Sequence, residues 1–177
     1  MVKDTIKSLI VTKQKEIPFP VMERDGELPL NSQSIVTVVG VRRCGKSSRM
    51  QLTINALVEK GLSPEAVLWV GFDDERLSGM NVSDLDKVLE AYRELYPTQD
   101  LKDVYMFFDE IQLIANWELF VMRVFKSYCK NIFVSGSNAK MLSQEIATTL
   151  RGWSIEEKTY PLSFMEYCQF TGIKTHH

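Results

Sequence analysis

The chain has 177 residues, of which 45% are hydrophobic and 25% are charged. This length suffices for one core of ordinary size and is short for two full-sized domains. The formal net charge of -2 excludes a global basic field of the kind that draws proteins to nucleic acid or to anionic lipid.

The predicted elements alternate between helices and strands. Apolar residues at helical spacing predict a first helix over residues 5–11, and Pro18 prevents its continuation. A β-branched run over residues 35–39, without alternating polar residues, predicts a strand that is covered on both faces. An apolar stripe then predicts a helix over residues 46–60, which Gly61 ends in a left-handed conformation.

The rest of the chain continues this alternation. Further strands are predicted at residues 66–72, 104–108, 132–134 and 155–162, and further helices at residues 85–95, 117–128 and 140–150. Strands that are separated by helices pair in parallel through right-handed crossovers. The predicted fold class is therefore α/β, with a three-layer α/β/α sandwich.

A phosphate loop is predicted at residues 40–47, because GVRRCGKS matches G-x-x-x-x-G-K-[ST]. Glycines let consecutive N–H groups turn inward around a β-phosphate, and the positive end of the next helix adds to that field. Lys46 can reach the β- and γ-phosphates, and the Ser47 hydroxyl can join a Mg²⁺ shell. A chance match in a chain of this length has a rate of about 1%. The residues predicted to bind the nucleotide are Gly40, Arg43, Cys44, Gly45, Lys46, Ser47 and Ser48.

Three side chains of this loop have alternative interpretations. Arg42 and Arg43 can face phosphate or solvent, and solvent is favoured for at least one of them. Cys44 is interpreted as a small filler beside the phosphates rather than as a catalytic thiol, because no histidine is nearby in the sequence to activate it.

An acidic pair, Asp109 and Glu110, follows the apolar run VYMFF at the edge where open α/β sheets bind ligands. We predict that Asp109 holds Mg²⁺ through its water shell. Glu110 would orient and deprotonate the water that attacks the γ-phosphate. Asp109 can alternatively cap a following helix, but the order of the motifs along the chain favours a magnesium-assisted NTPase.

Polar residues also end two other predicted strands. Asn138, or as a second choice Ser137, is predicted to hold the attacking water or the γ-phosphate, although capping of the next helix is equally supported. Asp73, Asp74 and Arg76 leave the second strand at the same edge, where a solvated loop or a helix cap explains them best.

The segments GVRRCGKSS, VGFDDERL, FFDEIQLIANWE, SGSNAKMLSQEIATTLRG and YPLSFMEY occur in this order. Together they resemble the predicted AAA+ ATPases of bacteria and archaea, whose N-terminal ATPase domain precedes a C-terminal domain of unknown function. The resemblance implies a mainly parallel five-stranded sheet of order 5-1-4-3-2. It supports the roles given above to Lys46, Ser47, Asp109, Glu110 and Asn138.

The resemblance also implies a role for Arg151, at the end of TTLRG, as an arginine finger toward the γ-phosphate of a neighbouring subunit. The family usually has a second arginine where this chain has Trp153, and a surface or ion-paired arginine is an equally supported reading. Family members continue beyond YPLSFMEY for a comparable length. We therefore predict an N-terminal helix and extended segment packed on the core (1–30), a P-loop ATPase core (31–162) and the start of a truncated downstream region (163–177).

The leading hypothesis is Mg²⁺-dependent ATP hydrolysis that drives a change in a partner domain or assembly. The alternative is a slow nucleotide-dependent switch or binding module that acts through protein or DNA contacts. A GTPase is disfavoured because no N-K-x-D motif occurs, and a small-molecule kinase is disfavoured by Glu110 and by the lack of an acceptor-binding lid. The expected cofactors are ATP and Mg²⁺.

The expected partners are ATP or ADP and the missing C-terminal domain. A homo-oligomer is left open, and nucleic acid is left open without support from any residue. No stretch reaches the roughly 18 apolar residues of a membrane span, so no membrane partner is expected. The separated cysteines Cys44, Cys129 and Cys168 are typical of reduced thiols, and we expect a cytoplasmic location.

Overall fold

A computed structural model describes residues 1–24, 26–136 and 144–174, and within them five parallel strands form one sheet in the order β2-β3-β4-β1-β5. The strands are β1 (Ile35–Val39), β2 (Val67–Gly71), β3 (Tyr105–Asp109), β4 (Ile132–Gly136) and β5 (Ser154–Lys158). The parallel pairing and the strand order confirm the fold that the sequence and the resemblance implied.

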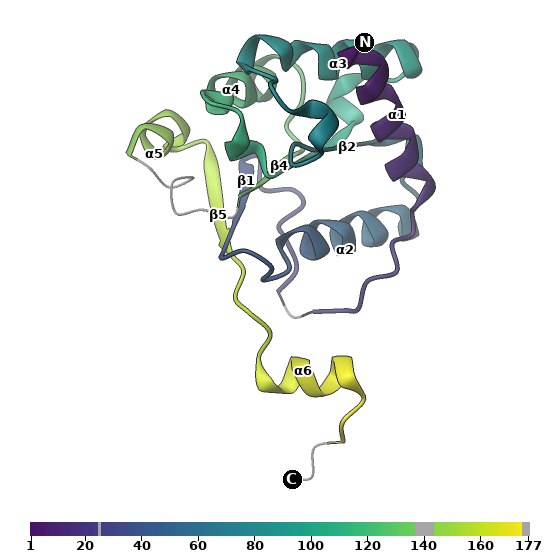
Figure 1. Ribbon diagram of the computed structural model, residues 1–177, viewed down its shortest axis with the longest axis vertical. Coiled ribbons are helices and arrows are strands. Elements are labelled where there is room, and N and C mark those ends of the chain that lie inside the picture. Colours follow the sequence, from purple (N-terminus) through teal and green to yellow (C-terminus); the bar gives the residue numbers. More distant parts are fainter. Residues whose placement is uncertain (25, 137–143, 175–177) are drawn as a thin grey trace.

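Helices cover both faces of this sheet, as Figure 1 shows. The α-helices are α1 (Val2–Lys15), α2 (Lys46–Glu59), α3 (Asp86–Leu95), α4 (Trp117–Ser127), α5 (Gln144–Leu150) and α6 (Phe164–Thr171). The short 3-10 helices are η1 (Pro64–Ala66), η2 (Glu75–Leu77), η3 (Val82–Asp84), η4 (Leu101–Asp103) and η5 (Ile111–Leu113). Within the described ranges, no helix combines the length and the apolar character that a membrane crossing requires.

The two faces of the sheet have separate cores. On one face, Trp69, Phe107 and Phe133 from three adjacent strands stack in a row, with ring centroids 5.9 Å and 4.7 Å apart. This row packs with α2 through Met50 and Ile54. On the other face, α1, α3 and α4 pack together over β2, β3 and β4. The central strands are therefore buried on both faces, as their uninterrupted apolar runs predicted.

The first helix is longer than its apolar pattern predicted, since α1 spans Val2–Lys15 rather than residues 5–11. Its last turn is held by tertiary contacts. The Gln14 side chain is buried and donates a hydrogen bond to the carbonyl oxygen of Val67 at 2.9 Å, and the Lys13 ammonium lies 4.7 Å from the Trp69 ring centroid. These partners lie on β2, so the periodicity of the helix alone could not reveal them.

The segment between α1 and β1 lies along α2. Phe19 is buried there, and the Asn55 side chain both accepts from the Phe19 N–H at 2.7 Å and donates to its carbonyl oxygen at 2.9 Å. This pairing of a side-chain amide with a backbone residue fixes the segment against α2.

The C-terminal part differs from its prediction in two ways. Strand β5 ends at Lys158, so the prediction of strand over residues 159–162 is wrong. An unpredicted helix, α6, follows and lies below the main body in Figure 1. Ser163 begins it with a capping box, because its hydroxyl accepts from the Glu166 N–H while the Glu166 carboxylate accepts from the Ser163 N–H.

Candidate nucleotide-binding site

The phosphate loop connects β1 to α2, and two of its positions require glycine. A Cβ at Gly40 would lie 2.4 Å from the carbonyl oxygen of Thr159 and 2.6 Å from the Cys44 sulfur. Gly45 has a φ of +96° and turns the chain into α2. The loop backbone is thus packed closely against neighbouring groups, which side chains at these two positions would displace.

The Lys46 ammonium is enclosed by the loop that precedes it. The residue is 4% exposed, and Nζ donates to the carbonyl oxygens of Gly40 at 3.1 Å and Val41 at 2.8 Å. No acidic group in the described part of the chain forms a salt bridge with it. A buried cation that only dipoles compensate is stabilised by a bound anion, so the loop fits a phosphate group.

A hydroxyl and a carboxylate meet beside this lysine. The Ser47 hydroxyl, in the first turn of α2, donates to Asp109 Oδ2 at 2.7 Å at the end of β3. The two residues therefore lie at one point of the sheet edge, although they are far apart in the sequence. Oxygen donors of this kind are the ligands that Mg²⁺ prefers, and the pair fits such an ion.

Asp109 is buried, at 7% exposure, and burial raises the pKa of its carboxyl group. Hydrogen bonds from Ser135 and Ser47 act in the opposite direction, while the charges of Glu110 and Asp73 raise the pKa further.

Strand β3 includes Asp109 as its last residue, which corrects the prediction that the strand ends at residue 108.

Ser135 connects the two acidic residues, and the sequence analysis did not single it out. Strand β4 continues to Gly136 instead of ending at residue 134, so Ser135 lies beside the end of β3. Its hydroxyl donates to Asp109 Oδ1 and accepts from the Glu110 N–H at 3.1 Å. The expected sheet order was a usable signal, since it makes β3 and β4 neighbours. The register, which pairs Phe108 with Val134, then brings residues 109 and 135 side by side.

Glu110 stands at a sharp turn between β3 and η5. It has a φ of 54°, a left-handed conformation that is unusual for a residue with a side chain. Its Oε2 accepts from the Gln112 side-chain amide at 2.6 Å. The position of this carboxylate is therefore set by the turn and by a hydrogen bond two residues further on.

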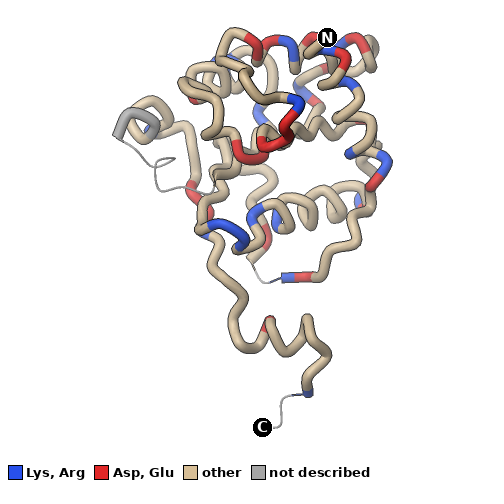
Figure 2. Tube along the Cα trace, viewed as in Figure 1, with Lys and Arg blue, Asp and Glu red and all other residues tan. Residues whose placement is uncertain are grey.

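The other predicted site residues lie in different surroundings. Cys44 is buried, and its sulfur lies 3.8 Å from Lys46 Nζ, whereas Arg42 and Arg43 are exposed. Ser48 is half-buried in the first turn of α2. Figure 2 shows the basic stretch of the loop in blue between β1 and α2.

Of the remaining predictions, Asn138 and Ser137 lie outside the described residues. Arg151 is exposed where α5 ends, and none of its described contacts joins it to the loop.

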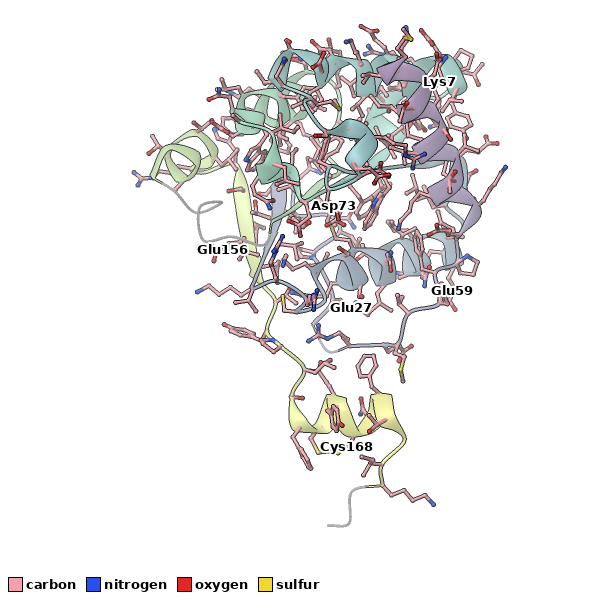
Figure 3. All side chains as sticks on the ribbon, viewed as in Figure 1. Lys7, Glu27, Glu59, Asp73, Glu156 and Cys168 are labelled. Atoms are coloured by element: carbon pink, nitrogen blue, oxygen red, sulfur yellow. The ribbon has the colours of Figure 1, made fainter. Side chains whose placement is uncertain are left out.

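The helix-cap interpretation is confirmed for Asp74, whose carboxylate accepts from the Arg76 N–H at the start of η2. Figure 3 labels Asp73 at the sheet edge above α2.

Two arginines that were not among the predicted site residues connect the loop and the start of α2 to segments that are distant in the sequence. Arg49, one turn into α2, donates to the carbonyl oxygens of Gly26 at 2.7 Å and Lys158 at 3.0 Å. Arg24 donates to the carbonyl oxygen of Cys44 at 2.6 Å. Their acceptors lie twenty or more residues away in the sequence, so no local pattern announces these contacts.

Comparisons with known proteins cover most of the chain. The family model described as an AAA domain matches residues 32–168. An uncharacterized protein of Methanocaldococcus jannaschii is 37% identical over 150 residues, which are 85% of this chain and 32% of that protein. An uncharacterized protein of Haemophilus influenzae is 35% identical over 133 residues, or 75% of this chain and 32% of that protein.

The chain therefore spans about a third of the length of these curated relatives. Among solved structures, PCH-2 of C. elegans is similar with a TM-score of 0.49 and 14% sequence identity. The similarity covers 93% of this chain and 43% of PCH-2.

Proposed function

Because the chain belongs to the AAA domain family and carries a P-loop ATPase-like nucleotide-binding core, we propose that it binds ATP with Mg²⁺ and hydrolyses it. The observation that carries this proposal is the 2.7 Å hydrogen bond between Ser47 and Asp109, beside the enclosed ammonium of Lys46. These three groups come from two elements, and together they form the donor set that a magnesium-bound triphosphate requires.

In this mechanism the phosphate loop supplies the binding energy. The residues from Gly40 to Ser48 surround the β-phosphate, and Lys46 exchanges its carbonyl partners for β- and γ-phosphate oxygens. The contacts of the ammonium with charged phosphate oxygens are stronger than its contacts with neutral carbonyl oxygens. Cys44 fills the space between Gly40 and Lys46 and takes no part in the chemistry.

Ser47 and Asp109 are the residues that would hold the magnesium ion, Ser47 directly and Asp109 through water. When bound, this ion neutralises the charge that develops on the phosphate oxygens. Ser135 keeps the Asp109 carboxylate in place, and its second hydrogen bond fixes the backbone of Glu110.

Glu110 is the proposed base, which orients a water molecule and accepts its proton as the water attacks the γ-phosphate. Gln112 holds this carboxylate at 2.6 Å. Asn138 is proposed to contact the attacking water or the γ-phosphate. Arg151 is proposed to act on the nucleotide of a neighbouring subunit, in agreement with its exposure and with its lack of a described contact to the loop.

The turnover of ATP is further proposed to move a partner domain, which in the longer relatives would belong to the two thirds of the chain outside the matched region. The alternative, a slow switch, has the same binding site and differs in rate. Both readings predict nucleotide binding, and only the first predicts turnover that depends on Glu110.

The experiment that separates them measures phosphate release and ATP affinity for the wild type and for Glu110→Gln. We expect unchanged affinity and a loss of turnover of about 100-fold or more. Glu75→Gln is the matched control, because Glu75 is an exposed acid at the same sheet edge. A wild-type protein that binds ATP without measurable turnover supports the switch, and an undiminished rate in Glu110→Gln excludes Glu110 as the base.

The role of Arg151 requires a mixing experiment. Subunits that carry Arg151→Ala are combined with subunits that carry Glu110→Gln. If Arg151 is an arginine finger, each variant alone is inactive. Phosphate release is measured once assembly of the mixture is confirmed. Recovery of activity supports catalysis across a subunit interface. No recovery in assembled mixtures contradicts it.

A further inference from the structure

The guanidinium of Arg24 joins three parts of the chain that are distant in the sequence. Its side chain is 8% exposed. One terminal nitrogen donates to the carbonyl oxygen of Cys44 at 2.6 Å, and the other donates to that of Tyr160 at 2.9 Å. Nε donates to Glu166 Oε1 at 3.3 Å, in an ion pair whose carboxylate side chain is 13% exposed. One cation therefore contacts the phosphate loop, the segment after β5 and helix α6.

The contact with Cys44 bears on the phosphate-binding groups of the loop. A peptide unit is planar and trans, so its C=O and its N–H point in opposite directions. When Arg24 holds the carbonyl oxygen of Cys44, it also fixes the direction of the Gly45 N–H on the other side of the same peptide plane. Gly45 lies in the part of the loop that is proposed to surround the phosphates.

The side chain of Arg24 also packs against the loop. A Cβ at Gly45 would lie 2.4 Å from a terminal nitrogen of Arg24, in addition to the strain of a side chain at a φ of +96°. The position of the guanidinium and the turn into α2 therefore depend on one another.

At the other end of this contact, Glu166 belongs to the first turn of α6. The same carboxylate that binds Arg24 accepts from the Ser163 N–H at 2.8 Å and so caps the helix. Figure 1 shows α6 below α2, separated from the sheet by the length of the connecting segment. A displacement of α6 would thus move the carboxylate that orients Arg24.

We propose that Arg24 is a positioning residue of the phosphate loop and that Glu166 couples its position to α6. Nucleotide affinity then depends on the location of α6, and nucleotide binding in return stabilises α6 in this location, because coupling between two sites is reciprocal. This inference rests on the proposed function in one respect, which is that the loop binds a nucleotide.

The first test measures binding of Mg·ADP to the 177-residue chain by calorimetry. We expect the dissociation constant to rise about tenfold for Arg24→Ala and about threefold for Glu166→Gln, as for the loss of hydrogen bonds to charged groups. The matched control is Glu94→Gln. Glu94 forms an ion pair with Lys3 between α3 and α1, in the helical layer on the face of the sheet opposite α2, and is remote from the loop. Unchanged affinity in both variants, in a wild type that binds ADP, overturns the proposal.

The second test measures hydrogen exchange without nucleotide, in residues 40–48 and in residues 163–171. Coupling predicts faster exchange in both segments for Glu166→Gln. If Glu166 merely caps α6, exchange accelerates in residues 163–171 alone, and this result overturns the coupling. Hydrogen exchange also separates the failure of this proposal from the failure of the proposed function. A wild type without affinity for ADP contradicts the proposed function. The exchange pattern still decides whether Arg24 and Glu166 couple the loop to α6.

A conservative variant separates positioning from general stability. Lysine at position 24 can donate to one or two of the acceptors but cannot span all three as the planar guanidinium does. We expect Arg24→Lys to have an unfolding temperature and an affinity for Mg·ADP that both lie between those of the wild type and Arg24→Ala. Equal affinities of Arg24→Lys and Arg24→Ala, with equal unfolding temperatures, would contradict a role through the guanidinium contacts.

Discussion

The phosphate-loop region and the C-terminal part from α5 to α6 differ in what they bury. At the loop, polar groups are enclosed: Lys46 is 4% exposed, Asp109 is 7% exposed and Ser135 is fully buried. In the C-terminal part, large apolar side chains face water, with Phe164 at 74% and Tyr167 at 51% exposure. A substitution near the loop therefore disturbs several partners at once, whereas one on the surface of α6 removes few contacts within this chain. Substitutions in the two regions test this difference.

The largest effect is expected for Lys46→Ala. Removal of a buried, hydrogen-bonded charge from a binding contact costs about 2–5 kcal/mol, so ATP affinity should fall about 30-fold or more. Fluorescence titration with a labelled ATP analogue measures this change. Lys102→Ala serves as the control, because Lys102 is exposed and lies away from the loop. Equal ATP affinity in wild type and Lys46→Ala would refute the binding site.

A smaller effect is expected for Ser135→Ala. The variant loses the hydroxyl that holds Asp109 and the backbone of Glu110, and we expect phosphate release to slow about tenfold while ATP affinity changes less. Steady-state kinetics separates the two quantities. Ser127→Ala, an exposed serine at the end of α4, is the matched control. A rate like that of the wild type would show that Ser135 does not position the acidic pair.

Asp109→Asn should stabilise the nucleotide-free protein while it weakens Mg²⁺-dependent binding. Burial raises the pKa of Asp109 in the folded state above its unfolded value, so folding favours the protonated form. The associated stability is present below about pH 4 and is lost as the pH rises through the folded pKa. At pH 7 the variant should therefore unfold at a higher temperature than the wild type.

Thermal unfolding between pH 4 and pH 8, without nucleotide or Mg²⁺, checks this sign. The difference between Asp109→Asn and the wild type should grow with pH and vanish near pH 4. A wild-type protein that is the more stable one at pH 7 would show that the hydrogen bonds from Ser47 and Ser135 outweigh the cost of burial.

The smallest effect is expected for Phe164→Ser on α6. The side chain is 74% exposed, so its replacement should change the unfolding temperature of this chain by less than about 2 °C and leave ATP affinity unchanged. The matched comparison is Phe120→Ser, which removes a buried ring of α4 and should destabilise by about 3 kcal/mol or more. Similar losses in both variants would contradict the contrast between the two regions.

Local patterns predicted the elements that carry the site. The β-branched run of β1, the glycine loop and the apolar stripe of α2 are each continuous in sequence, and all three lie where they were predicted. The sheet order was available through the resemblance rather than from periodicity. The boundaries of the strands were predicted less accurately than their positions. Strand β4 extends to Gly136, because the polar residue Ser135 can be buried within it when its hydroxyl is hydrogen-bonded to the neighbouring strand β3.

Residues with distant partners escaped prediction. Arg24 contacts Glu166 across 142 positions, and Arg49 contacts Lys158 across 109 positions. Neither arginine belongs to a motif, and each could equally have been a solvated surface residue. The roles of all the predicted site residues stay predictions, including those of Asn138 and Arg151.

The sequence by itself determined the phosphate loop, since Gly40, Gly45, Lys46 and Ser47 specify backbone angles and charge within a few residues. Only the tertiary structure decided which groups surround that loop. The parallel sheet brings Asp109 and Ser135 to one edge, and the crossing segments bring Arg24 to Cys44 and Glu166. The reason is that buried polar groups must find partners wherever chain packing places them, and this spatial requirement leaves no local pattern in the sequence.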